Sequence, residues 1–385
     1  MQLSWGEMAG YRARVRGCLL GGAVGDALGS PVEFLSWGAI RERYGAAGVT
    51  GLVADGEGVV GRVGDGTQLT VFTAEGWLHG YQRNSSYGLG GAEGAIMRDA
   101  CLRWLDTQEH PEPPPAEGLR HRTGRLREER WLYARRAPGE ACLSGLRVEH
   151  TPDPYGRPDG AAGPVNPGSK GCGAVMRSAP FGFTDRGAER AFEFAAQCAR
   201  ITHGHPTAYY AAGAFAAMIN YLVHGESPEG AVRRAMELLA RYPGYEETGA
   251  ALRRAVDLSA DGEASVERLQ TLGAGRVAEE ALAIGVYALL GRTRPQAFHV
   301  GSRGAVCDSR PPRTAVEAAF LLSVNHSGDS GSTGSICGNL LGAHHGDVRL
   351  PHHWIARVEG RAAIAALADD CAAEVCPGES RAWGC

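Results

Sequence analysis

The chain has 385 residues, of which 44% are hydrophobic and 21% charged, and its formal net charge is −4. This composition is ordinary for a globular protein with a sizeable core, and the small negative charge gives no electrostatic reason to expect nucleic acid or a membrane as a partner. No segment is long and apolar enough to span a membrane. The first apolar stretch is interrupted by Asp26, which is not typical of a signal peptide. We therefore expect a cytoplasmic protein.

Residues 11–34 form the first informative segment, because glycine recurs at positions 17, 21, 25 and 29. One face of a helix would therefore carry no side chains. Since each glycine costs a helix about 1 kcal/mol relative to alanine, four in register indicate close approach by a second helix. Asp26 and Glu33 would then project from the end of this helix toward a common site. The alternative is a small-residue packing face with two solvated acids.

Two more helices are predicted before the pattern breaks. Residues 61–78 predict a helix capped by Asp65 or Thr67, and residues 93–106 predict another. The segment at about 107–167 is rich in Pro, Gly and Arg. It predicts a long surface excursion with one short helix near 129–135.

Glycines 168, 171 and 173 precede an apolar run, and the backbone N–H groups of such a loop can cradle a diphosphate. A plain junction between a loop and a helix is the commoner explanation of this pattern. From residue 186 onward alanine is abundant and alternation is almost absent, which predicts helices at 188–202, 206–223, 228–240, 246–257, 263–269, 276–290, 313–325 and 354–372. The predicted fold class is all-α, as a single domain over residues 1–385.

The segment 323–343 carries the most oxygen side chains. Asp329, Ser332 and Thr333 form a loop of carboxylate and hydroxyl groups that opens into residues at helical spacing. Such a loop suits a hard cation or a phosphate, although a simple helix cap has the same residue types.

Together these segments resemble the ADP-ribosylglycohydrolase family, including the dinitrogenase-reductase-activating type. The resemblance covers most of the chain and rests on motifs in the family's order: Gly17–Gly29 (GCLLGGAVGDALG), Thr67–Glu75 (TQLTVFTAE), Lys170–Arg177 (KGCGAVMR), Thr202–Pro206 (THGHP), Glu279–Leu282 (EEAL), the Asp329 loop and Gly338–Gly342 (GNLLG). It implies an all-helical fold around a cleft that holds ADP-ribose beside two Mg²⁺ ions. It also implies hydrolysis of the bond between the anomeric carbon and an acceptor, often an arginine or serine side chain.

The resemblance assigns Glu33, Asp65 and Asp329 as catalytic carboxylates and, with the Ser332 hydroxyl, as metal ligands. The chain departs from the family pattern at residues 64, 66 and 331, which are glycine where the family has a hydroxyl residue and two aspartates. Because Mg²⁺ depends on carboxylate charge and near-octahedral oxygen ligands, we expect no tightly bound cofactor and at most one weakly held Mg²⁺. The loops at 64–67 and 329–333 should lie together.

The substrate-binding residues implied by the resemblance are Ser169, Gly171, Cys172 and Gly173 of the diphosphate loop, Met176 after it, and His203 near the terminal ribose. Without the family context, His203 would be interpreted as a structural residue at the start of a helix.

Two functions are open at this point. The first is hydrolysis of an ADP-ribosyl or related ribosyl glycosidic bond, on a small nucleotide-derived molecule in place of a modified protein and without the usual Mg²⁺ pair. The alternative is a catalytically inactive family member that binds an ADP-ribose-like molecule or acts as a regulatory or structural partner. In both cases the expected partner is an ADP-ribose-like or nucleotide-derived small molecule, and the sequence leaves the oligomeric state open.

Overall fold

A computed structural model describes residues 5–88, 90–291 and 314–376, and helices are the only extended regular structure in these ranges. The α-helices are α1 (Trp5–Gly29), α2 (Trp37–Tyr44), α3 (Asp65–Tyr87), α4 (Glu93–Glu109), α5 (Glu140–Leu146), α6 (Gly173–Met176), α7 (Ala188–Ala199), α8 (Pro206–Val223), α9 (Pro228–Leu239), α10 (Glu246–Ala260), α11 (Val266–Leu269), α12 (Ala278–Leu290), α13 (Ala315–Val324), α14 (Ser330–His345), α15 (His352–Ile355) and α16 (Arg361–Val375). Short 3₁₀-helices join them: η1 (Ser30–Val32), η2 (Leu126–Glu128), η3 (Arg130–Leu132), η4 (Ala179–Phe183), η5 (Gln270–Leu272) and η6 (Asp347–Arg349). The predicted all-α fold class is confirmed. None of the helices in the described ranges has the length and hydropathy to cross a membrane.

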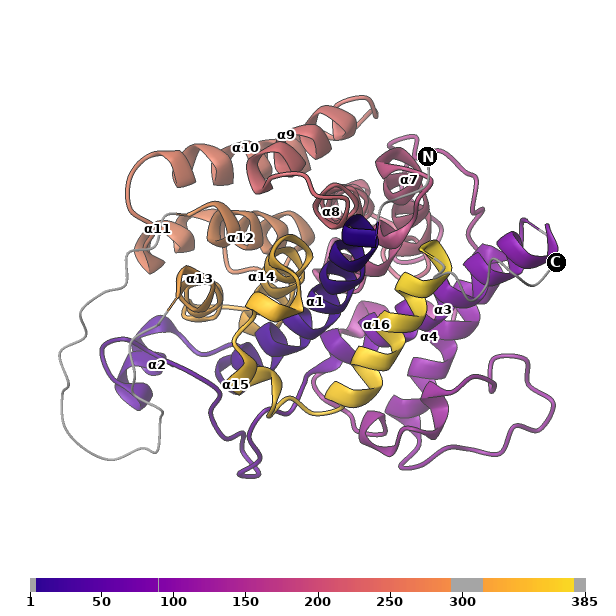
Figure 1. The fold of residues 1–385 in the computed structure, drawn as a ribbon, viewed down its shortest axis with the longest axis horizontal. Coiled ribbons are helices and arrows are strands. Elements are labelled where there is room, and N and C mark those ends of the chain that lie inside the picture. Colours follow the sequence, from indigo (N-terminus) through magenta and orange to yellow (C-terminus); the bar gives the residue numbers. More distant parts are fainter. Residues whose placement is uncertain (1–4, 89, 292–313, 377–385) are drawn as a thin grey trace.

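The centre of the fold is an antiparallel pair, α1 and α14, whose backbones touch (Figure 1). A methyl group added at Gly25 would lie 1.8 Å from the carbonyl oxygen of Gly334, and one added at Gly338 would lie 2.0 Å from the carbonyl oxygen of Gly21. The contact repeats at every turn, so the close approach predicted from the four-residue glycine spacing is confirmed.

The other helices cover this pair from two sides. On one side α16 packs against α1 and α3, and α4 lies along α3. On the other side α12 and α13 pack against α14, while α7, α9 and α10 surround α8 and α12. The end of α1, the start of α14, the start of α3 and the short α6 therefore meet in one region, which holds the candidate site.

The segment 107–167 differs from the prediction of a surface excursion with a helix near 129–135. Beyond the end of α4, its α-helix is α5, which begins eleven residues after the predicted start. Its apolar side chains, such as Leu126, Leu132 and Leu143, are buried against the rest of the fold. Pro138 disfavours helical backbone just before it, and burial of Leu126 and Leu132 anchors two 3₁₀-helices in place of an α-helix.

The last predicted helix, 354–372, is also interrupted. The chain forms α15 and then α16, separated at Gly360, whose φ of 67° lies in the left-handed region. A side chain there would collide with the Trp131 ring, 2.4 Å from its Cζ2 atom, so the break is set by packing against a distant segment. The helix predicted from residue 313 begins at Ala315 in the structure, and residue 313 itself lies outside the described residues.

The backbone contact between α1 and α14 predicts a large cost for one added methyl group. Gly338→Ala should lower the free energy of unfolding by at least about 3 kcal/mol, the upper part of the range for overpacking, because the nearest atom is backbone and cannot swing away. Gly10→Ala is the control, since its methyl group would meet only the end of the Arg14 side chain, at 3.6 Å, in the same helix. We expect that control to gain about 0.5–1 kcal/mol. Urea unfolding of both variants measures the difference, and equal stabilities would contradict the packing described.

Candidate functional site

Asp26, near the end of α1, holds the loop that opens α3. Its Oδ2 accepts hydrogen bonds from the N–H groups of Gly64 and Thr67, both at 2.9 Å, and from the Thr67 hydroxyl, while Oδ1 accepts from the Ser30 hydroxyl at 2.8 Å. The prediction that Asp65 or Thr67 caps α3 is wrong, because the cap position is Gly64, which has no side chain. Asp26 supplies the missing acceptor from another helix. The sequence placed Asp26 near a common site but gave it no role.

The structure brings the three predicted carboxylates together. Asp65 is the first residue of α3, and its Oδ2 accepts the Gly139 N–H at 3.3 Å. Asp329 caps α14 by accepting the Ser332 N–H at 2.9 Å, so the simple capping interpretation of this loop also holds. Glu33 follows η1 and lies close enough to Asp329, Asp65 and Asp26 for their charges to raise its pKa. The loops that begin α3 and α14 therefore face a common centre, as expected.

Phe34 fixes the position of Glu33. It has a φ of 64°, which is unfavourable for a residue with a side chain, and its N–H donates to the carbonyl oxygen of Gly328 at 2.7 Å. Such a conformation costs on the order of 1–3 kcal/mol and persists only where the surroundings impose it. The bond to Gly328, directly before Asp329, ties the Glu33 segment to the start of α14.

Crowding of these acids raises their pKa values. Burial, and then repulsion from Asp329, Asp65 and Asp26, raises the pKa of Glu33 to about 9. Burial, followed by repulsion from Asp26 and Asp329, raises the pKa of Asp65 well above its usual range. Burial also raises the pKa of Asp26, although its hydrogen bonds from Thr67 and Ser30 oppose the shift. Like charges held this close in a partly dry site do not all ionise together at neutral pH.

The glycine-rich loop before α6 lies directly beside the carboxylates. It pairs with the segment before α12, where the Cys172 N–H donates to the Arg276 carbonyl oxygen at 3.1 Å. The N–H groups of Gly171 and Gly173 have no hydrogen-bond acceptor within the described part of the chain, which leaves them available to an anion. The Cys172 thiol donates to Asp329 Oδ2 at 2.9 Å, and burial raises its pKa, so the sulfur stays protonated.

The segment that contains His203 and His205 holds this loop in place. The Ser169 carbonyl oxygen accepts the His205 N–H at 3.3 Å, and His203 is 2% exposed. A methyl group added at Gly171 would lie 3.1 Å from His203 Nε2, and one at Gly173 would lie 2.8 Å from Cys142 Sγ, so both positions require small residues. His203 is thus packed against the loop, and its role near the ribose stays a prediction.

Two sulfur atoms lie beside the Ser332 hydroxyl, which the resemblance assigned as a metal ligand. The Ser332 hydroxyl lies 3.3 Å from Met176 Sδ and 3.4 Å from Cys172 Sγ, and a side chain added at Gly66 would start 3.3 Å from the same Met176 sulfur. In the described ranges, no group of three or more His, Cys, Asp or Glu side chains is arranged to hold a metal ion. Since Mg²⁺ selects an all-oxygen shell, these residues do not fit a pair of Mg²⁺ ions.

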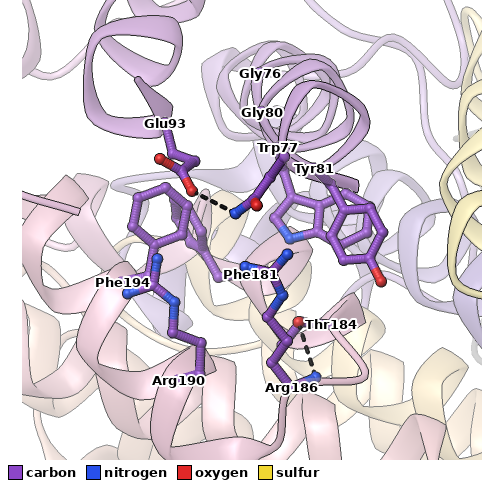
Figure 2. A pocket seen from close by; sticks show the side chains of 11 residues that line it. Gly76, Trp77, Gly80, Tyr81, Glu93, Phe181, Thr184, Arg186, Arg190 and Phe194 are labelled. Atoms are coloured by element: carbon purple, nitrogen blue, oxygen red, sulfur yellow. Dashed lines mark hydrogen bonds between the residues drawn. The ribbon is translucent and has the colours of Figure 1, made fainter. Parts of the chain in front are cut away.

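An aromatic pocket between α3, α4 and α7 is separate from this site (Figure 2). Trp77, on its wall, is twelve residues beyond Asp65, or about 18 Å along α3. The Glu93 carboxylate in this pocket is already bonded to Asn84 at 2.9 Å and to the Tyr155 hydroxyl at 3.1 Å. The pocket volume is about 30 Å³, enough for little more than a water molecule or two. It offers no reactive group.

Comparison with known proteins gives consistent matches. The sequence profile of the ADP-ribosylglycohydrolase family matches residues 7–381. A curated relative, ADP-ribosyl-(dinitrogen reductase) glycohydrolase of Rhodospirillum rubrum, is 22% identical over 353 residues, which are 90% of this chain and 90% of that protein. A solved structure described as an ADP-ribosylglycohydrolase-related protein complex aligns with a TM-score of 0.58 and 23% identity, covering 95% of this chain and 99% of the other. That structure supports the fold.

The buried His203 predicts acid sensitivity. Burial, with repulsion from Arg177, lowers its pKa to about 3, whereas the unfolded chain has a histidine pKa of about 6.5. Between these values the unfolded state binds a proton that the folded state does not, so the free energy of unfolding falls as the pH falls below 6.5. In urea unfolding at pH 4 to 6, His203→Gln should reduce the slope of the free energy of unfolding against pH by up to about 1.4 kcal/mol per pH unit. The exposed His352→Gln control should keep the natural slope, and an unchanged slope in His203→Gln would contradict the burial.

Proposed function

Because the chain belongs to the ADP-ribosylglycohydrolase family, we propose that it hydrolyses the glycosidic bond of a small ADP-ribosyl or related ribosyl compound without a pair of Mg²⁺ ions. The observation that carries this proposal is the hydrogen bond between Cys172 Sγ and Asp329 Oδ2, 2.9 Å long. It joins the loop with free N–H groups to the carboxylate cluster. A ligand with its diphosphate on that loop would have its ribose beside Asp329.

The chemistry follows from this placement. Cleavage of a ribosyl bond passes through a transition state with positive charge on the sugar ring, which nearby carboxylates stabilise. Asp329, on the side of the diphosphate loop, and Asp65, at the start of α3, would face the anomeric carbon. One of them would accept a proton from the attacking water, whose oxygen bonds to that carbon while the acceptor leaves with a proton. Glu33, whose pKa is raised to about 9, would lie toward the acceptor and give it the proton with which it leaves.

Metal-independent action rests on the glycines at residues 66 and 331, where the resemblance expects carboxylates. Met176 and Cys172 contact the Ser332 hydroxyl that the family pattern would offer to a metal. The hydrogen bond from the thiol also occupies the Asp329 oxygen that faces the loop. We propose that water is activated by a carboxylate directly, with one weakly held Mg²⁺ as the upper limit.

The first test separates catalysis from binding. Asp329→Asn should lower turnover of ADP-ribosyl-arginine or ADP-ribose 1″-phosphate by about 10²–10⁴-fold, the usual contribution of a general base. Calorimetry should show less than about a threefold change in the Kd of ADP-ribose, because Asn caps a helix as well as Asp does. The control is Asp159→Asn, an exposed residue whose carboxylate also accepts a local N–H, that of Ala161 at 3.1 Å. Turnover should be the same with and without EDTA.

Each result has a defined meaning. ADP-ribose binding without turnover of either compound would favour the inactive, ligand-binding alternative. No binding at millimolar ADP-ribose, with or without Mg²⁺, would contradict both functions. Loss of activity on chelation would contradict the metal-independent mechanism.

The second test restores the missing acids. A side chain at Gly331 would begin 3.5 Å from Glu33 Oε2 and 3.6 Å from Asp26 Oδ1, and one at Gly66 would meet only the Met176 side chain closely. Gly66→Asp with Gly331→Asp should therefore fold, but with added repulsion that a divalent cation relieves. We expect Mg²⁺ to raise the Tm of this double variant by a few degrees, since a ligand at 100 times its Kd contributes about 2.7 kcal/mol.

The natural chain should show no such shift with Mg²⁺. The control variant, Gly6→Asp with Gly38→Asp, adds the same charge where a side chain meets no carboxylate within 4 Å. Its Tm should not respond to Mg²⁺ either. A Tm rise of the natural chain at micromolar Mg²⁺ would overturn this interpretation of Gly66 and Gly331.

A further inference from the structure

A cavity of about 330 Å³ opens on the Glu33 side of the carboxylate cluster. Ser30, Glu33 and Gly64 line it and also belong to the candidate site, so the cavity and the site share a wall. The residues of the diphosphate loop do not line it. If ribose lies between the loop and Asp329, this cavity is the space that the group beyond the scissile bond would enter.

The remaining walls are built from two well-held segments. One is the turn at residues 54–60, closed by a bridge between Ala54 and Val60 and by the Asp55 carboxylate, which accepts the N–H groups of Glu57 and Val59, both at 2.9 Å. The other is the segment 135–137. There Arg136 donates to Glu359 and, at 2.6 Å, to the Val63 carbonyl oxygen. The cavity is therefore formed before any ligand arrives.

Two of the three arginines that line the cavity are paired with carboxylates, and the third is not. Arg62 forms ion pairs with both Asp55, at 2.9 Å, and Glu57, at 2.7 Å. Arg136 is paired with Glu359. Arg135 also lines the cavity, and its guanidinium has no hydrogen-bond or ion-pair partner among the described residues.

This arrangement of charges favours a negatively charged acceptor group of the substrate over a positively charged one. The carboxylates of Asp55 and Glu57 are already bonded to Arg62. Glu33 is the remaining carboxylate of the lining, and it lies on the wall that the cavity shares with the carboxylate cluster. A cationic acceptor would also face Arg62, Arg135 and Arg136. An oxyanion, in contrast, would find the unpaired Arg135, and arginine is well suited to bind phosphate or carboxylate through two parallel hydrogen bonds.

We propose that this cavity is the acceptor subsite and that Arg135 selects substrates whose acceptor carries an oxyanion, a phosphate or a carboxylate, over arginine-linked ADP-ribose. The inference rests on the proposed function, since it takes ADP-ribose to be the other half of the substrate. A volume of about 330 Å³ is at the lower end for small-molecule pockets and suits a compact acceptor. Arg135 is a specificity residue and takes no part in bond cleavage.

The experiment compares three probes by calorimetry: ADP-ribose, ADP-ribose 1″-phosphate and ADP-ribosyl-arginine. The protein is the full chain with Asp329→Asn to prevent turnover, in EDTA to exclude metal effects. We expect the glycosyl phosphate to bind about tenfold more tightly than ADP-ribosyl-arginine, the size expected for one charge-assisted pair. Adding Arg135→Glu should abolish or reverse this preference while the Kd of ADP-ribose stays within about threefold.

Arg130→Glu is the matched control. Arg130 is an exposed arginine five residues before Arg135 and does not line the cavity, so the same change of charge there should leave the preference intact. Equal affinity of the two conjugates, or an Arg135→Glu variant that keeps the preference or weakens ADP-ribose equally, would overturn the inference and leave the proposed function standing. Failure of ADP-ribose itself to bind would overturn the proposed function and the inference with it.

Discussion

The fold depends on the contact between two helix backbones. Glycines 17, 21 and 25 of α1 lie against Gly342, Gly338 and Gly334 of α14 at distances that admit no side chain on either helix. Gly29 lies against the Ser330 backbone, where no side chain fits on α1. A pair this close allows one antiparallel register, because a shift would bring side chains into the same space. The end of α1 is thereby held at the start of α14. Glu33 and Asp329 belong to the two ends of the chain, and this contact places them together.

Asp26 extends the arrangement to a third helix. Its carboxylate accepts the N–H groups of Gly64 and Thr67 at the start of α3, where Gly64 offers no cap of its own. This buried acid therefore replaces a local cap by a tertiary one. The position of Asp65 depends on this bond from Asp26. Helix α1 therefore positions an acid at the start of α3, Asp65, and one at the start of α14, Asp329. The glycines at residues 66 and 331 do not weaken this framework, since Asp26 has hydrogen-bond partners of its own.

Carboxylate oxygens line one side of the site, and thiol and thioether sulfurs line the other. On one side are crowded carboxylates, with the pKa of Glu33 raised to about 9 by burial and by repulsion from its neighbours. On the other side are the Cys172 and Met176 sulfurs, which contact Ser332. Residues 66 and 331 are glycine and add no carboxylate to this cluster, so the acids that are present repel one another less than they would with two more charges.

The sequence by itself determined the helical class, the glycine face of α1, and most helices after residue 186, because these depend on local periodicity and propensity. It also indicated Glu33, Asp65, Asp329 and the loop at 169–173 through motifs that are continuous in the chain. Only the tertiary structure decided that Asp26 caps α3, that Cys172 bonds to Asp329, and that the segment 107–167 buries its leucines. It also decided which arginine of the cavity remains unpaired. Each of these is a contact between residues far apart in the chain, and such contacts leave no periodic trace in the sequence.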